Sequence, residues 1–246
     1  MIKSKTIHQS YHNLAIDIKH YFQTSDDTIF KKRNTIKIVE FLDEKFAVKS
    51  FRVPNFINQI AYRYIRDSKA KRSYLNSIRL LELGVSTPQP IGYVEFGTFG
   101  LKESFYISRF FEYDFEIRAV FNDSSFDNRE QILREFVAFS YDLHNKGVYH
   151  IDYSPGNVLI KKEDTRYKFA IVDVNRMKFI NFSDELRFKN LSRFSTSMQD
   201  LEFIAIEYAK VSGIDTQYAK DTLLKYHNKH QEYLQRKKRL KKLKRR

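Results

Sequence analysis

The sequence has no cysteine and no tryptophan. The lack of cysteine excludes a disulfide framework and a thiolate zinc site, and it permits a reducing cytoplasm. Glycine and proline are scarce, at 7 and 4 of 246 residues, which argues against a β-sandwich and against a long disordered chain. No run of 18 apolar residues is present, and the N-terminal residues are mostly polar. We therefore expect neither a transmembrane helix nor a signal peptide.

Acidic residues are outnumbered, with 30 Asp and Glu against 44 Lys and Arg, so the net charge is +14. Such a charge predicts acidic partners. Residues 236–246 form a basic tail with nine Lys and Arg in eleven positions. Three interpretations of the basic tail stay open: a solvated helix end, an anchor on an anionic membrane surface, and a contact with RNA or DNA. We expect nucleic acid least, and a cytoplasmic protein that is soluble or peripheral at the inner face of the cytoplasmic membrane.

The hydrophobic content of 42% and the aromatic content of 15% are enough for a sizeable core in one large or two small domains. The first 25 residues predict only a short helix or a loose extension. Alternating apolar residues predict strands between residues 28 and 53, with a hairpin turn at Asp43-Glu44. The remaining elements expected in this half are a helix or linker over 54–66, a helix over 68–83, and strands over 91–96 and 105–110.

The second half predicts mainly helices. The expected elements are helices over 116–122 and 128–146, strands over 157–161 and 168–173, and helices from about residue 184 to the C-terminus. Asp127 is the expected cap of the second helix and Gly147 its end.

The segment 150–157 reads His-Ile-Asp-Tyr-Ser-Pro-Gly-Asn, and a second Asp, Asp173, ends a nearby apolar strand. Two Asp and one Asn in this pattern fit phosphoryl transfer, which depends on positioning and charge neutralisation. An acceptor hydroxyl must lose its proton, and Asp152 is the candidate base. Mg²⁺ prefers oxygen ligands, which Asn157 and Asp173 would supply. The alternative for the Asp and Asn residues is a role in turns or helix caps.

A lysine precedes these residues in the chain. Ala47-Val48-Lys49 lies near the end of an expected strand, and Lys49 is the candidate for binding nucleotide phosphates. A solvated lysine at a strand end is the alternative interpretation.

These motifs, in this order, resemble those of protein-kinase-like enzymes. His150-x-Asp152-x-x-x-x-Asn157 is similar to the catalytic loop of that superfamily, and Asp173-Val174-Asn175 stands where it has Asp-Phe-Gly. The resemblance is greater still to the lipopolysaccharide kinase family, the Kdo/WaaP-like enzymes. The supporting motifs are Arg33-Asn34, Leu83-Gly84-Val85-x-Thr87-Pro88-x-Pro90, Leu143-His144-x-x-Gly147-Val148 and Asp173-Val174-Asn175-Arg176.

The resemblance implies an α+β, bilobal protein-kinase-like fold with a small β-rich N-lobe and a larger helical C-lobe. The implied division is an N-terminal extension over 1–27, a phosphate-binding N-lobe over 28–110, a catalytic C-lobe over 111–235 and the basic tail over 236–246. The implied cofactors are ATP and Mg²⁺. The implied acceptor is a lipopolysaccharide core sugar, Kdo or heptose, or a lipid-linked sugar.

Two positions depart from the kinase pattern. Residues 30–36 lack glycine, which fits lipopolysaccharide kinases because that family also lacks a typical Gly-rich loop. Ser73 stands where related sequences have the Glu that pairs with the lysine, so the acidic partner of Lys49 is open. A protein or small-molecule kinase, and a pseudokinase that only binds, remain alternatives to a sugar kinase.

Several other polar residues are interpreted as structural. His150 is expected to support the loop by hydrogen bonds, and Asp200 to brace it from a later helix. Arg176 is equally compatible with a phosphate contact and with a salt bridge. The pairs His8 with His12 and His227 with His230 have no carboxylate that would complete a zinc site.

Overall fold

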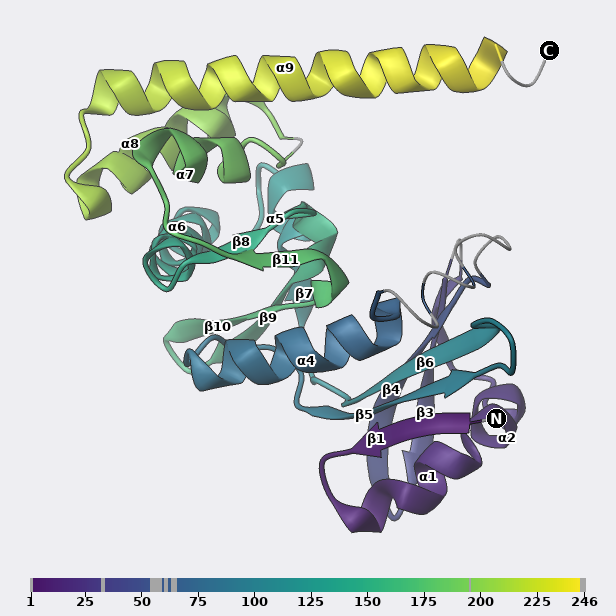
Figure 1. The fold of residues 1–246 in the computed structure, drawn as a ribbon. Coiled ribbons are helices and arrows are strands. Elements are labelled where there is room, and N and C mark those ends of the chain that lie inside the picture. Colours follow the sequence, from purple (N-terminus) through teal and green to yellow (C-terminus); the bar gives the residue numbers. More distant parts are fainter. Residues whose placement is uncertain are drawn as a thin grey trace. The chain divides into compact units, whose positions relative to one another are not determined.

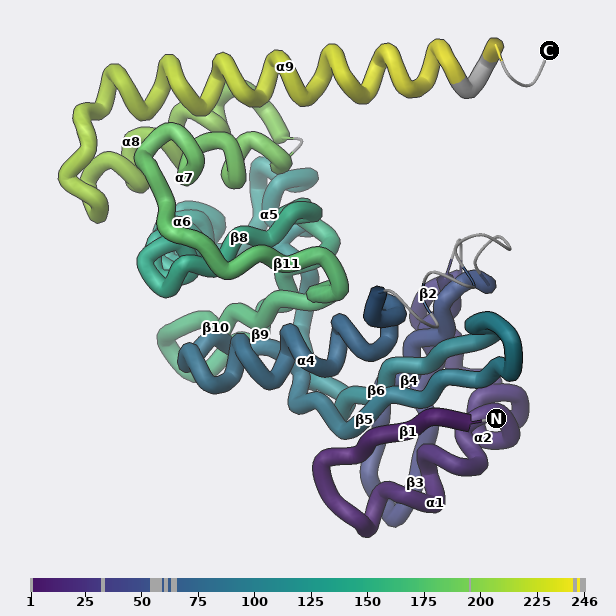
Figure 2. Tube along the Cα trace, in the orientation of Figure 1, coloured from purple at the N-terminus to yellow at the C-terminus, as the bar shows by residue number. Residues whose placement is uncertain are grey.

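The computed structural model describes residues 2–31, 34–53, 59, 62, 66–194 and 196–243. Arg33 and most of the segment 54–66, the expected helix or linker, lie outside the described residues. The chain forms two compact units, whose course can be followed in Figures 1 and 2. Unit 1 comprises residues 1–112 and 171–176, and unit 2 comprises residues 113–170 and 177–246. The fold class is α+β, with a sheet in unit 1 and mainly helices in unit 2, which confirms the prediction.

Unit 1 is built on a six-stranded antiparallel sheet with the strand order β1-β5-β6-β4-β3-β2. Its strands are β1 Ile2–Thr6, β2 Thr28–Lys31, β3 Thr35–Phe41, β4 Glu44–Phe51, β5 Pro90–Phe96 and β6 Glu103–Arg109. Successive side chains of a strand point to opposite faces. Phe46 and Val48 of β4 and Phe105 and Ile107 of β6 therefore share one face, where they form the core of the unit.

The N-terminal segment is an integral part of unit 1, although the sequence predicts only a short helix or a loose extension there. Strand β1 pairs with β5, and helices α1 (His12–Ile16) and α2 (Ile18–Thr24) follow it after a short 3-10 turn. Leu14, Ala15 and Ile18 are fully buried in the core of the sheet. The five residues of β1 show no alternation of apolar and polar side chains, so the sequence provides no signal for this strand.

The β3–β4 hairpin turns at Leu42-Asp43, one residue earlier than expected, since Phe41 pairs with Glu44. Leu42 and Asp43 have positive φ angles of 49° and 58°. A two-residue turn with both central residues in this region matches the right-handed twist of the flanking strands.

Helix α4 (Lys69–Glu82) covers the other face of the sheet. The ring of Tyr74 lies 5.5 Å from that of Tyr93 on β5, and Ser77 Oγ lies 2.8 Å from Tyr106 Oη on β6. Tyr93 and Tyr106 alternate with residues of the sheet core, so α4 and the N-terminal helices pack on opposite faces.

The described residues of unit 2 form two small sheets, β10-β9-β7 and β11-β8, and five α-helices. The strands are β7 Phe115–Glu116, β8 Val148–His150, β9 Val158–Glu163, β10 Arg166–Ile171 and β11 Met177–Phe179. The helices are α5 Ile117–Asn122, α6 Arg129–Asn145, α7 Asp184–Leu191, α8 Met198–Ser212 and α9 Thr216–Leu243. Asn128, and not Asp127, occupies the N-cap position of helix α6, and its side chain makes no capping hydrogen bond. Gly147, with a φ of 73°, follows the end of the helix.

Aromatic side chains fill the core of unit 2. The ring of Phe136 on α6 lies within 6.3 Å of four other rings, those of Phe121, Tyr153, Phe169 and Phe194. Tyr153 follows the candidate base Asp152 and is fully buried, so the candidate catalytic loop, residues 150–157, is tied to the centre of this core.

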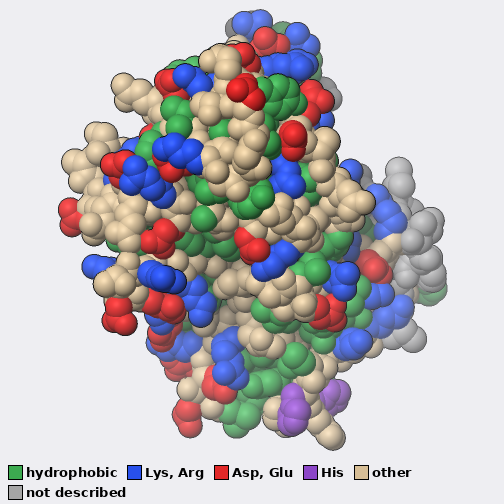
Figure 3. All heavy atoms as spheres, turned by 90° about the vertical axis from the view of Figure 1, so that its left-hand side faces the viewer, with side chains coloured by type: hydrophobic (Ala, Val, Ile, Leu, Met, Phe, Trp, Pro, Cys, Tyr) green, Lys and Arg blue, Asp and Glu red, His purple; other side chains and the backbone are tan. Residues whose placement is uncertain are grey.

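The basic tail continues helix α9 as far as Leu243. Side chains 236–240 of this helix are exposed, whereas Ala219 and Leu223 near its start are buried. No helix in the described part of the chain combines the length and apolar character needed to cross a membrane. On the face drawn in Figure 3, basic and acidic side chains are interspersed over most of the surface.

Candidate active site

Lys49 and Asp173 come together in unit 1, on the sheet face that α4 covers. Lys49 alternates with the core residue Val48 on β4, which sends its side chain toward α4. The segment 171–176 docks on the same side, since Asn76 Nδ2 of α4 donates to Val174 O over 2.7 Å. As a result, Lys49 Nζ lies 2.7 Å from Asp173 Oδ1.

This ion pair answers the question that Ser73 raised in the sequence. Ser73 is buried and its hydroxyl donates to Lys69 O over 2.9 Å, within its own helix. Lys49 is 9% exposed, so a buried ammonium needs a counter-charge, and the carboxylate of Asp173 supplies it. The kinase pattern offered no acidic residue for this role at position 73, and the partner of Lys49 comes from a segment more than a hundred residues later.

Asp173 has a φ of 57°, in the left-handed region. Residues other than glycine adopt this region at a cost of about 1–3 kcal/mol, and such strain often accompanies functional sites. Asn175 Nδ2 donates to Asp173 Oδ1, 2.5 Å away, so the unusual backbone places the carboxylate between an ammonium and an amide. The carboxylate is 31% exposed and retains access to solvent.

Asp152 and Asn157 come together in unit 2, on the loop after β8. Asn157 Nδ2 donates to Asp152 O over 2.8 Å, and Asn157 N donates to Ser154 O over 2.9 Å. These two bonds close the loop into a tight turn with Asp152 and Asn157 at its ends. The backbone N–H of Asp152 donates to His150 Nδ1 over 3.1 Å, so His150 supports the loop through a hydrogen bond, in the manner that its sequence context predicts.

A series of hydrogen bonds from helices α6, α7 and α8 holds the start of this loop. Asn190 Nδ2 on α7 donates to His150 O over 2.8 Å, so the amide oxygen of Asn190 faces His144 Nε2, at 3.2 Å. His144 Nδ1 then accepts from Tyr208 Oη, at 2.7 Å, and Tyr208 Oη accepts from Arg187 at 3.1 Å.

This series of hydrogen bonds requires a neutral His144, because Nε2 donates to Asn190 while Nδ1 accepts from Tyr208. Burial lowers the pKa of His144 to about 3, the bond to Asn190 opposes this shift, and the charge of Arg187 adds to it. Asn190 and His144 are 1% and 2% exposed, so both must keep their partners to avoid buried unsatisfied groups.

Asp200 does not brace the catalytic loop through any hydrogen bond seen in the described part of the chain, which differs from our expectation. Its carboxylate accepts from Arg129 and from Thr196 Oγ1, the latter over 2.6 Å. Burial alone would raise the pKa of Asp200, but the hydrogen bonds from Thr196, Arg129 and Ser197 outweigh it and hold the pKa below its usual value. Asp200 therefore ties α8 to α6, and Asn190 supports the loop instead.

Sequence reasoning missed the arginine beside the catalytic loop. Arg118 of α5 lies directly over Gly156, because a Cβ built on that glycine would come within 1.8 Å of Arg118 Nη2. Its Nη1 pairs with Glu116 at 3.4 Å. Neither Arg118 nor Asn190 belongs to a motif of regular spacing, so only the fold reveals their contact with the loop.

The donor atoms suit a magnesium-bound phosphate in kind. The amide nitrogen of Asn157 is engaged by the loop, which leaves its carbonyl oxygen as the atom for a hard cation, and Asp173 offers a part-exposed carboxylate. Among the described residues, no three His, Cys, Asp or Glu side chains gather as a metal site, so a cation here would need oxygens from its substrate as well. The roles of Lys49, Asp152, Asn157 and Asp173 stay predictions.

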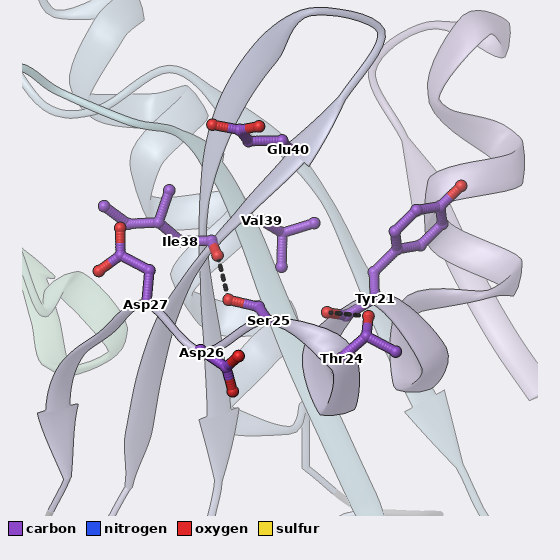
Figure 4. Close-up of a pocket in the computed structure, with 8 residues that line it drawn as sticks. All are labelled: Tyr21, Thr24, Ser25, Asp26, Asp27, Ile38, Val39 and Glu40. Atoms are coloured by element: carbon purple, nitrogen blue, oxygen red, sulfur yellow. Dashed lines mark hydrogen bonds between the residues drawn. The ribbon is translucent and has the colours of Figure 1, made fainter.

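A pocket of about 250 Å³ lies elsewhere in unit 1, lined by α2, the segment 25–27 that follows it, and β3 (Figure 4). Ser25 Oγ donates to Ile38 O across its wall over 2.5 Å. The carboxylates of Asp26, Asp27 and Glu40 line it, and no candidate site residue does. Its acidic lining is unsuited to a triphosphate, so we do not assign the nucleotide to it.

Comparisons with known proteins give information on the fold and the family of the chain. No curated protein sequence is significantly similar to the chain. The solved structure "WaaP in complex with acyl carrier protein" has a TM-score of 0.64 and 15% sequence identity, and covers 94% of this chain and 99% of that chain. This likeness concerns the fold.

The sequence model of the family described as "Lipopolysaccharide kinase (Kdo/WaaP) family" matches residues 55–214. The matched span begins after Lys49 and contains Asp152, Asn157 and Asp173. The match covers more than half of the sequence, and we conclude that this phosphotransferase belongs to the lipopolysaccharide kinase (Kdo/WaaP) family.

Proposed function

We propose that the protein transfers the γ-phosphoryl group of ATP to a hydroxyl of Kdo or heptose in the lipopolysaccharide inner core. The observation that carries the proposal is the closed loop from Asp152 to Asn157 within a chain of this family. The family supplies the kinase activity and the lipopolysaccharide context. The choice of sugar is our own.

Asp152 is the proposed base. The acceptor oxygen attacks the γ-phosphorus, the bond from that phosphorus to the bridging oxygen of ADP breaks, and the acceptor proton passes to the Asp152 carboxylate. The bond from the Asp152 N–H to His150 and that from Asn157 to Asp152 O fix the backbone on both sides of the base. A fixed base matters because most of the rate gain in phosphoryl transfer comes from positioning.

Lys49, Asp173 and Asn157 are the proposed ligands of Mg·ATP. Lys49 would bind phosphate oxygens, and Asp173 and Asn157 would hold Mg²⁺ through oxygen atoms. The cation, when bound, neutralises charge on the phosphate oxygens. The short Lys49–Asp173 pair supports this proposal, because it keeps an ammonium and a carboxylate side by side in a largely buried place.

The test is turnover of ATP by the full chain with purified dephosphorylated lipid A–core as acceptor. We expect one phosphate on the core sugar for each ADP formed, located by mass spectrometry of the product. The assay is run with and without acyl carrier protein, because the similar WaaP structure is a complex with that protein. Transfer to protein substrates alone would favour a protein kinase, and an absence of any transfer despite Mg·ATP binding would favour a pseudokinase.

We also propose that the basic tail brings the enzyme to its acceptor. A core acceptor carries acyl chains and stays in the membrane, so the enzyme must reach a surface. The exposed side chains at 236–240 on α9 add four charges, and each Lys or Arg contributes about 1 kcal/mol near anionic lipid. The effective range is a Debye length of about 8 Å at physiological salt.

A further inference from the structure

The last turn of α7 and the segment after it lie against the candidate catalytic loop at two points. Asn190 Nδ2 donates to His150 O over 2.8 Å, and the ring of Phe194 meets that of Tyr153 edge to face at 4.9 Å. His150 and Tyr153 flank the candidate base in the sequence. Arg193 lies between the two anchoring residues and is therefore held beside the loop that carries Asp152.

Helix α9 fixes the side chain of Arg193. Arg193 Nη1 lies 3.2 Å from His230 Nδ1. A guanidinium only donates, so His230 Nδ1 accepts and the imidazole is neutral. His227, one turn earlier, is buried against the backbone of Ser192 and Phe194, which fixes the register of α9 on this segment.

The pair of Arg193 and His230 lies close enough to Asp152 to interact with its carboxylate electrostatically. Burial, followed by the charges of Arg193 and His227, lowers the pKa of His230, while the carboxylate of Asp152 acts in the opposite direction. His230 is thus neutral at physiological pH, and the positive charge of the pair resides on Arg193.

Arg193 keeps its charge available for a ligand. Within the described ranges, no carboxylate lies at ion-pair distance from Arg193, and its one hydrogen bond leaves four of five N–H donors. The other two basic residues of the same region are committed: Arg187 bonds to Tyr208 and lies 3.9 Å from Asp184, and Lys189 is exposed beside the ring of Tyr226. A half-buried, oriented guanidinium of this kind suits a carboxylate or a phosphate.

We propose that Arg193, oriented by His230, binds an anionic group of the acceptor sugar while the hydroxyl of that sugar meets Asp152. The ligand chemistry is a carboxylate or phosphate on the sugar itself. Kdo is an acid sugar and carries such a carboxylate. The inference rests on the proposed function for the identity of the acceptor, but the anion site can be tested without any transfer reaction.

The direct test measures binding to the full chain by titration in nuclear magnetic resonance, without ATP. The probes are Kdo, its uncharged methyl ester and inorganic phosphate. In Arg193→Ala we expect Kdo to bind about 10- to 100-fold more weakly, the usual effect of losing a charged hydrogen bond. The methyl ester should bind the wild type no better than the variant. A stronger response to phosphate than to Kdo would assign the site to a phosphorylated sugar.

Three further variants separate binding from folding. Lys189→Ala removes one charge from the same region and should leave Kdo binding unchanged. Arg193→Lys should retain part of the affinity. His230→Gln keeps an acceptor for Arg193 and should bind Kdo better than His230→Leu. Equal affinity of wild type and Arg193→Ala for Kdo and phosphate, or no binding of either by a folded wild type, would overturn the anion site.

Kinetics distinguish this inference from the proposed function. With a core acceptor, Arg193→Ala should raise KM for the acceptor about tenfold or more and leave KM for ATP unchanged. An unchanged acceptor KM with an active wild type would reject the anion site and keep the sugar kinase. Binding of Kdo through Arg193 without transfer to any core acceptor would keep the anion site and reject the sugar kinase. A raised KM for ATP alone would mean that the nucleotide, instead of the acceptor, supplies the anion.

Discussion

Replacement of Asn190 by alanine tests the hydrogen-bond chain beneath the catalytic loop. The variant removes the donor to His150 O and the acceptor for His144 Nε2, two groups whose residues are 1% and 2% exposed. A buried group that loses its partner costs about 1–3 kcal/mol, so two of them cost about 2–6 kcal/mol. A water molecule in the vacated space would recover part of this, and we expect the free energy of unfolding to fall by about 3 kcal/mol.

The same variant should slow catalysis. The His150 ring accepts a hydrogen bond from the backbone N–H of Asp152, so a displacement of His150 would also displace Asp152. A misplacement of about 1 Å costs on the order of 10²-fold in rate. We expect kcat to fall by about 10- to 100-fold, with Mg·ATP affinity little changed.

Urea unfolding followed by circular dichroism measures the first effect, and steady-state transfer measures the second. Lys189→Ala, an exposed neighbour on α7, serves as the control and should change the free energy of unfolding by less than about 0.5 kcal/mol. A loss below about 1 kcal/mol in Asn190→Ala, together with an unchanged kcat, would refute the supporting role of the chain.

Because burial lowers the pKa of His144 to about 3, the folded protein binds fewer protons than the unfolded protein between pH 3 and 6.5. The contribution of His144 to the free energy of unfolding is therefore fully present above pH 6.5, and urea unfolding should show a loss of about 2 kcal/mol from pH 7 to 5. The His144→Asn variant should show a flatter pH profile. Asp173→Ala and Asn157→Ala should each weaken binding of Mg·ATP far more than that of metal-free ATP; an unchanged Mg²⁺ titration in both would reject the metal site. Deletion of residues 236–246 should keep activity on a short soluble acceptor but lose co-sedimentation with anionic vesicles, and high salt should reproduce that loss in the full chain; undiminished sedimentation would leave a solvated end or nucleic acid as the explanation.

Much of the fold could be predicted because the elements have strong periodic signals. The helices at 69–82 and 129–145 and the strands β9 and β10 lie within a few residues of their predicted bounds, whereas the short strands β7, β8 and β11 were not predicted. The N-terminal segment was missed because β1 has a mixed pattern, and only its pairing with β5 decides its conformation. The hairpin turn was one residue off because the twist of the sheet favours a two-residue turn with positive φ angles, which Leu42 and Asp43 adopt, so that Glu44 already pairs with Phe41.

The candidate site could be predicted only where its residues are close in sequence. The spacing from Asp152 to Asn157 reflects one tight loop, so it is visible in the sequence. The partner of Lys49 is not, because the pair with Asp173 depends on the docking of residues 171–176 beside α4. Arg193 depends in the same way on the packing of α7 and α9 around the loop.

The most direct measurement of the central assignment is transfer by Asp152→Asn. Asparagine keeps the size of the side chain and a hydrogen-bonding oxygen but cannot accept the acceptor proton. With dephosphorylated lipid A–core as substrate, we expect the variant to fold and bind Mg·ATP like the wild type while transfer falls by roughly 10²-fold or more. Near-normal transfer by Asp152→Asn would contradict the assignment of Asp152 as the base.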